Sequence, residues 1–267
     1  MMTRLERTSN SSIDVKRRRY LLPGADSTAR WTGTGHCDYH ADVNYLALLV
    51  LPVVAAGLAL ATGRLPLKLG VPALCALILV STLRRSPPSG RQQVWAVVAA
   101  FGLSMVGDYF LSSRRGHPHY FEAGIAAFFG AHLGYLRYSL LNGGLHRRAL
   151  AVLLLVFVSY FGLALAPVIE SGMLRVAVLL YLLISCVGLA AALGLKQPVV
   201  VKSIYAAGIG LVVFSDTIIS FSEFLHYRAL NGWILPTYYL AHLAITASIL
   251  PRKDLGSMPD CENALID

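Results

Sequence analysis

The sequence is organised as a series of apolar segments that are long enough to cross a lipid bilayer. A helix needs about 20 predominantly apolar residues to span the hydrocarbon core. Segments of about this length cover residues 43–62, 65–83, 93–112, 119–141, 147–168, 173–195, 202–222 and 233–250. Only 14% of the residues are charged, whereas soluble domains carry about 25%. The sequence therefore predicts an all-α, polytopic membrane protein with eight transmembrane helices.

Short joints rich in turn-forming residues separate these segments. They lie at residues 87–90, 115–118, 142–144, 170–172 and 231–232. Because the joints are short, we expect consecutive helices to be antiparallel neighbours. Residues 43–250 would form one transmembrane catalytic domain.

The two ends of the chain are polar. Residues 1–42 include the basic run Lys16–Arg19 and are predicted to be a disordered tail that contacts anionic lipid headgroups. Residues 251–267 form a short second tail. With eight spans, sixteen Lys and Arg lie on the side of the termini and six on the opposite side. This bias predicts that both termini are cytoplasmic, in the endoplasmic reticulum of a eukaryote or the plasma membrane of a bacterium.

The net charge of +9 is explained by this topology and by lipid contact. Basic residues are not interleaved with aromatic ones on a soluble surface, so no nucleic-acid partner is expected. The sequence gives no indication of the oligomeric state.

An internal repeat is visible in the apolar sequence. Residues 102–112 align with 210–220, and residues 131–133 align with 241–243. Four spans in each half would make the halves parallel repeats, related by an axis along the membrane normal. Chance similarity between apolar segments is the alternative explanation.

Two aspartates lie within apolar segments, Asp108 in SMVGDYFL and Asp216 in LVVFSDTII. Ionisable groups inside a membrane are rare, face a polar cavity and are functional candidates. Both spans run outward, which places the two carboxyl groups roughly 6 and 9 Å below the outer boundary at 1.5 Å per residue. We predict that Asp108 and Asp216 form a catalytic pair.

Two buried carboxyl groups suit acid–base chemistry. Burial disfavours the charged form, and a neighbouring carboxylate disfavours it further. One group can then keep its proton and act as an acid while the other stays ionised and acts as a base.

Other polar side chains lie on helical faces at a similar depth. They are candidates for binding substrate or positioning water, with plainer roles as interfacial anchors, solvated helix ends or helix–helix hydrogen bonds as the alternative. The candidates are His132, Tyr135, Tyr238, Tyr239, His242, Ser220 and Glu122.

Several classes of enzyme find no support in the sequence. It contains no GxSxG, HExxH, phosphate-binding glycine loop or Cys/His nucleophile pair. The cysteines are scattered and lack metal-ligand or disulfide spacing. Neither a metal nor an organic cofactor is expected.

Four segments carry a resemblance to a known family. They are GDYFL at 107–111, AFFGAHLGYL at 127–136, FSDTIISF at 214–221 and TYYLAHLAIT at 237–246. In this order they resemble the YhhN-like integral-membrane lysoplasmalogenases, over about residues 43–250. The family pattern often has Gln where this chain has His242.

The resemblance implies hydrolysis of the vinyl ether bond of lysoplasmalogens, lysophospholipids with an ethanolamine or choline headgroup. The products would be a fatty aldehyde and a glycerophospho-ethanolamine or -choline. Such a reaction needs a proton donor, an anion near the developing cation and a positioned water. One aspartate can act as the acid and the other as the base or electrostatic stabiliser.

Three other classes of protein fit parts of the pattern. A proton-coupled transporter would also use paired intramembrane aspartates and parallel repeats. An intramembrane aspartyl protease would need a GxGD motif, but Met105 occupies the first glycine position, and no Pro-Ala-Leu follows Asp216. A non-catalytic lipid-binding protein would bind the same lipid without turnover.

Overall fold

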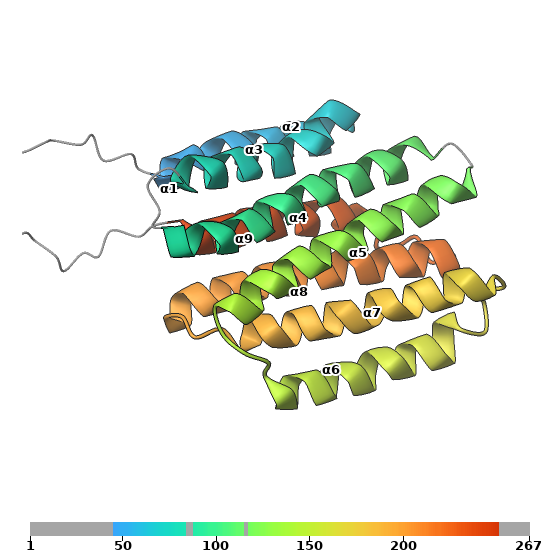
Figure 1. Cartoon of the computed structure of the whole chain (residues 1–267). Coiled ribbons are helices and arrows are strands. Elements are labelled where there is room, and N and C mark those ends of the chain that lie inside the picture. Colours follow the sequence, from blue (N-terminus) through green and yellow to red (C-terminus); the bar gives the residue numbers. More distant parts are fainter. Residues whose placement is uncertain (1–44, 84–87, 115–116, 251–267) are drawn as a thin grey trace, which may run out of the picture. The chain divides into compact units, whose positions relative to one another are not determined.

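The computed structural model describes residues 45–83, 88–114 and 117–250, so both predicted tails, 1–42 and 251–267, lie outside the described residues. The described chain is helical (Figure 1). Its elements are α1 (Tyr45–Leu48), α2 (Val50–Thr62), α3 (Leu65–Leu83), α4 (Pro88–Ser113), α5 (Pro118–Leu141), α6 (Arg147–Tyr160), the π-turn η1 (Phe161–Leu165), α7 (Gly172–Leu193), α8 (Val199–Phe224), the 3-10 turn η2 (Asn231–Trp233) and α9 (Ile234–Ile249).

Each predicted apolar segment contains a helix. The first holds α1 and α2, the fifth holds α6 with η1, and the last holds η2 and α9. Five helical stretches in the described part of the chain are long and apolar enough to cross a membrane, namely α3, α4, α6 with η1, α7 and α8. The all-helical fold is confirmed, and its long apolar helices are those of a multi-pass membrane protein.

Local sequence sets several helix ends. Gly63 ends α2 in the left-handed conformation, with φ 65°, where glycine has no steric penalty. Pro118 begins α5, a position where its missing N–H costs nothing. The Ser171 hydroxyl accepts a hydrogen bond from the Leu174 N–H at 3.3 Å and caps the start of α7.

Six helices form a closed ring of contacts. In the order α3, α4, α5, α7, α8 and α9, each packs against the next, and α9 packs back on α3. The helix α2 lies outside the ring on α3, and α6 lies outside it on α7 (Figure 1). All six helices therefore contribute side chains to the interior of the ring.

The contacts of the first four long helices recur among the last four. The pairs α2–α3, α3–α4 and α4–α5 correspond to α6–α7, α7–α8 and α8–α9. The contact between α3 and α9 likewise corresponds to that between α7 and α5. Two parallel repeats related by a two-fold axis along the bundle would produce this pattern.

One expectation about neighbouring helices is wrong. We expected all consecutive helices to be neighbours, but α5 packs on α7, and α6 lies on the far side of α7. The joint between α5 and α6 instead pairs with the joint after α7, through hydrogen bonds from Gly144 N to Gly194 O at 3.1 Å and from Lys196 N to Asn142 O at 3.0 Å. A Cβ on Gly143 would lie 2.5 Å from the Gly194 carbonyl oxygen, so this close approach requires glycine.

Apolar side chains cover the outside of the bundle. On α6 no residue is buried, and Leu155 is 71% exposed. In the following turn Leu163 is 83% exposed, and α2 presents Val50 and Leu51 in the same way. An exposed apolar surface of this extent is unfavourable in water and suits contact with lipid.

The interior of the ring contains polar side chains as well as apolar ones. Tyrosine, histidine, serine and threonine side chains are buried among the aliphatic ones on α4, α5, α7, α8 and α9. They include Ser104, His132, Tyr135, Ser139, Ser185, Tyr205, Ser215, Tyr238, Tyr239, His242 and Thr246.

Candidate active site

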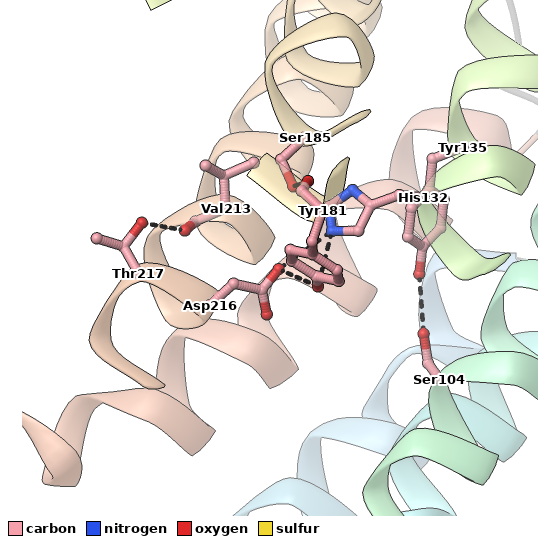
Figure 2. A network of polar contacts seen from close by, with 8 residues as sticks. All are labelled: Ser104, His132, Tyr135, Tyr181, Ser185, Val213, Asp216 and Thr217. Carbon is pink, nitrogen blue, oxygen red and sulfur yellow. Dashed lines mark hydrogen bonds and ion pairs between the residues drawn. The ribbon is translucent and has the colours of Figure 1, made fainter. Parts of the chain in front are cut away.

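Asp216 on α8 is held by side chains from two other helices. Its Oδ2 accepts a hydrogen bond from the Tyr181 hydroxyl of α7 at 2.8 Å. The Nε2 of His132, on α5, lies 3.1 Å from the same oxygen and 3.1 Å from the Tyr181 hydroxyl. Figure 2 shows the three side chains pointing toward one another. Because Oδ2 accepts from both partners, Nε2 carries the imidazole proton in this arrangement.

The Asp216 carboxyl group borders an apolar cleft between α5, α7 and α8. The side chain of Asp216 is 14% exposed, whereas that of His132 is 2% exposed. The cleft has a volume of about 70 Å³, and a polar cavity needs roughly 10–15 Å³ by the same measure to hold one water. Apart from Asp216 and a few hydroxyl groups, its lining is apolar. The lining includes Leu111, Phe121, Ile125, Phe128, Phe157, Val178, Leu182, Val213, Ile219 and Phe224.

Asp108 on α4 has a simpler environment. Its Oδ2 accepts one hydrogen bond, from the Tyr238 hydroxyl of α9 at 2.9 Å. The residue is half-buried and lies outside the lining of the apolar cleft. A Cβ on the preceding residue, Gly107, would lie 2.6 Å from the ring of Phe128. The glycine therefore admits a neighbouring aromatic ring beside Asp108.

The Phe128 ring connects the surroundings of the two aspartates. It lies against Gly107, packs edge-on against Tyr238 at 6.1 Å between ring centroids, and also lines the cleft that Asp216 borders. Helix packing thus brings both aspartates to the interior of the six-helix ring. The Phe128 side chain contacts the surroundings of each aspartate.

Tyr135 provides a second connection. Its hydroxyl lies 3.4 Å from that of Ser104, which is one helical turn before Asp108. Its ring packs at 89° to the His132 ring, with 6.3 Å between centroids. Figure 2 shows Tyr135 and Ser104 beyond His132 as seen from Asp216.

Three buried polar atoms have no hydrogen-bond partner among the described residues. They are His132 Nδ1, His242 Nε2 and the Tyr239 hydroxyl. Leaving such a group unpaired costs about 1–3 kcal/mol. The Nδ1 of His242 lies 2.9 Å from the Tyr238 carbonyl oxygen, and because it donates there, Nε2 is left as an acceptor. A water molecule or a polar substrate group would satisfy these atoms.

The predicted site residues divide into two groups and one outlier. Asp216 and Ser220 line the cleft, and His132 contacts Asp216. The Ser220 hydroxyl is 2.7 Å from that of Tyr160. On the other side of Phe128 lie Asp108, Tyr238, Tyr239 and His242, and Tyr135 lies between the groups. Glu122 is apart from both. It pairs with His119 at 3.4 Å and lines a groove between α5 and α7.

Tyr181 is a site residue that was not predicted from the sequence. It is a tyrosine inside an apolar segment, where a single aromatic side chain resembles an interfacial anchor. A hydroxyl placed well inside a span, as that of Tyr181 is, was the available signal, because a buried hydroxyl needs a partner. The ion pair between Arg114 and Glu223, whose atoms lie 2.7 Å apart, was not predicted either. These residues are remote in sequence, so no local pattern connects them.

No three His, Cys, Asp or Glu side chains of the described residues come together as metal ligands would. The polar groups at the two aspartates are hydroxyls, imidazoles and carboxyls, a set suited to moving protons.

The fold and this site together define an all-helical, multi-pass membrane protein with carboxyl groups inside its helix bundle. The chain belongs to the YhhN family, whose model matches residues 67–249. The matched segment lies within residues 43–250 and contains both aspartates, so the resemblance seen in the sequence is confirmed. No curated protein and no solved structure matches the chain.

Proposed function

We propose that this protein is a lysoplasmalogenase, which hydrolyses the vinyl ether bond of a lysophospholipid with an ethanolamine or choline headgroup. Membership of the YhhN family supports this proposal. The observation that carries it is the carboxyl group of Asp216, hydrogen-bonded by Tyr181 and His132 and bordering an apolar cleft. The apolar lining of this cleft suits contact with an aliphatic chain, and a carboxyl group suits protonation of a vinyl ether.

The reaction begins with proton transfer to the vinyl ether carbon that is not bonded to oxygen. This step leaves an oxocarbenium ion, which water captures to give a hemiacetal. The hemiacetal then breaks its bond to the glycerol oxygen, releasing the aldehyde and a glycerol hydroxyl group. The proton that water gives up restores the acid, so the enzyme returns to its starting state.

Asp216 is the proposed acid. Tyr181 and His132 both donate toward its Oδ2, so they stabilise the negative charge that develops as the proton leaves the other oxygen. Preorganised donors of this kind are a main source of transition-state stabilisation. The cleft is large enough for water beside the carboxyl group.

Asp108 is the proposed second carboxylate. It accepts the Tyr238 hydroxyl on the other side of Phe128. Its negative charge offsets the positive charge of the oxocarbenium ion from a distance. His242 and Tyr239 place unpartnered polar atoms in the same region, where they would position water.

The proposal includes a membrane topology. The protein would have eight transmembrane helices in two parallel repeats, with both termini cytoplasmic. In this topology α4 and α8 cross the membrane in the same direction. The recurring helix contacts support this duplication. The substrate would enter the cleft laterally from the bilayer, past the exposed helix α6.

The test uses the full-length protein in detergent micelles with a lysoplasmenyl-ethanolamine substrate. We expect release of a fatty aldehyde, and in D₂O we expect one deuterium on the carbon next to the aldehyde group. The corresponding saturated ether and ester lipids are the controls and should release no aldehyde. A transporter would release none from any of the three lipids, and an aldehyde without deuterium would contradict carbon protonation.

A further inference from the structure

A polar cleft adjoins the apolar one where α4 and α8 end. It has a volume of about 480 Å³ and shares Ile219 with the apolar cleft. Both helices end at the same end of the bundle (Figure 1). The cleft is lined by polar and charged side chains from the end of α4 and from the segment after α8. They include Arg114, Ser222, Glu223, His226, Arg228 and Asn231.

Arg114 is fixed in orientation within this cleft. Its two terminal nitrogens donate to the two oxygens of Glu223, at 2.7 and 2.8 Å. Its guanidinium carbon lies 5.8 Å from the centroid of Phe121, which lines the apolar cleft. The hydrogen bonds that the Arg114 guanidinium donates to Glu223 raise the pKa of the guanidinium, so it stays charged. Because a guanidinium has five donors, others remain for an anion.

Arg228 and His226 have no side-chain partner among the described residues. Both are exposed to solvent beside the polar cleft. His226 also has a φ of 55°, a conformation in which glycine is the usual residue after a helix. Two arginines and a histidine therefore surround a cleft that contains one carboxylate.

We propose that this polar cleft binds the phosphate of the single-chain phospholipid whose tail lies in the apolar cleft. The inference rests on the proposed function and adds the recognition of the headgroup. Arginine is suited to phosphate because its donors match two phosphate oxygens at once. Glu223 would attract the ammonium group of the same zwitterionic headgroup.

The spacing along α8 agrees with one ligand that fills both clefts. Glu223 lies two helical turns after Asp216, which separates them by about 10 Å along the helix. The phosphate and glycerol of a lysophospholipid lie on one side of its ether bond, and the aliphatic chain lies on the other. Phosphate near Arg114 would therefore place the ether bond toward Asp216 and the chain among the apolar residues.

The experiment measures binding to the full-length protein in micelles by calorimetry. The probe is a saturated 1-O-alkyl glycerophosphoethanolamine, which has no vinyl ether and cannot be hydrolysed by the proposed reaction. The comparison ligand is the 1-O-alkylglycerol with the same chain and no phosphate. We expect the phospholipid to bind at least about tenfold more tightly, because charge-assisted hydrogen bonds are the strong ones.

Arg228→Ala should lower the affinity for the phospholipid about tenfold, the loss typical of one hydrogen bond to a charged group, and should leave the affinity for the alkylglycerol unchanged. Arg148→Ala is the matched control, since it removes an equal charge from an exposed position at the start of α6, at the opposite end of the bundle. It should change neither affinity. Equal binding of the two ligands by the wild type, or full phospholipid affinity in Arg228→Ala, would overturn the proposal.

Competition separates a lipid headgroup from free phosphate. We expect soluble glycerophosphoethanolamine to displace the lipid probe at lower concentration than inorganic phosphate does. The reverse order would overturn the headgroup assignment in favour of a phosphate site. Because none of these measurements needs turnover, a protein that binds as expected but releases no aldehyde would refute the proposed reaction and leave the headgroup site standing.

Discussion

Asp108 and Asp216 occupy corresponding positions in the two halves of the chain, but their surroundings differ. Asp216 accepts hydrogen bonds from two side chains of two helices and borders an apolar cleft. Asp108 accepts one, from Tyr238, and lies outside the lining of that cleft. Each aspartate has one partner from the other half, since His132 of the first half reaches Asp216 and Tyr238 of the second reaches Asp108.

The difference shows how recurring helix contacts can hold two unequal carboxyl groups. The helix contacts recur between the halves, whereas the side chains inside the ring do not. Position 128 in the first half is phenylalanine, and its counterpart in the second half is Tyr238, which provides the hydroxyl that Asp108 needs. Unequal environments are what allow one carboxyl group to donate a proton while the other stays ionised.

The strongest test of this asymmetry is Asp216→Asn. The amide keeps the shape of the side chain and can still accept hydrogen bonds from Tyr181 and His132, so the protein should unfold at a temperature no lower than the wild type. It cannot donate a carboxylic proton, so aldehyde release should fall at least about a thousandfold, within the range of general acid–base catalysis. A folded variant with more than a tenth of the wild-type rate would show that Asp216 is not the acid.

Asp108→Asn should have a smaller effect. The lost group acts through its charge across Phe128, so we expect a fall of about 30- to 100-fold in kcat, equivalent to about 2–3 kcal/mol. Substrate affinity, measured as the Kd of the unhydrolysed alkyl lipid, should be unchanged. If both aspartate variants lose the same factor of at least a thousand, the two groups act as an equal pair and the proposed asymmetry fails.

The positions of the helices could be predicted from sequence because an apolar run of about 20 residues has few alternatives to a buried or lipid-facing helix. The two aspartates could be selected for the same reason, since an ionisable group in such a run needs a polar environment. Both predictions depend only on the order of residues along one helix.

The partners of the aspartates depend on which helices are neighbours, and the local pattern does not contain that information. His132 reaches Tyr181 and Asp216 because α5 packs on α7 rather than on α6. Glu122 is acidic like the two aspartates, yet it pairs with His119 and lines another groove. The direction in which a side chain points around its helix axis decides such cases.

A comparison of two glycines on α4 tests the close packing beside Asp108. A Cβ at Gly107 would lie 2.6 Å from the Phe128 ring, whereas a Cβ at Gly102 would have no atom within 4 Å. Gly102→Ala should stabilise the helix by up to about 1 kcal/mol. Gly107→Ala should have the same gain in helix propensity, but its Cβ would crowd the Phe128 ring. Overpacking of this kind costs about 1–3 kcal/mol.

The free energies of unfolding of these two variants should therefore differ by about 2 kcal/mol, measured by denaturant unfolding in micelles. Equal stabilities would mean that Phe128 moves away without cost and does not hold the two aspartate regions in place.

The smallest effect should distinguish the two tyrosine donors. Tyr181→Phe removes one of two hydrogen bonds to Asp216 and leaves the ring in the cleft, so we expect kcat to fall about tenfold, or about 1.4 kcal/mol. Tyr238→Phe removes the hydrogen bond to the second carboxylate and should lower kcat less than fivefold. Tyr160→Phe is the matched control, because its hydroxyl contacts Ser220 rather than either aspartate, and it should retain the wild-type rate. If Tyr238→Phe is the more harmful substitution, the acid is Asp108 and the roles of the two aspartates are exchanged.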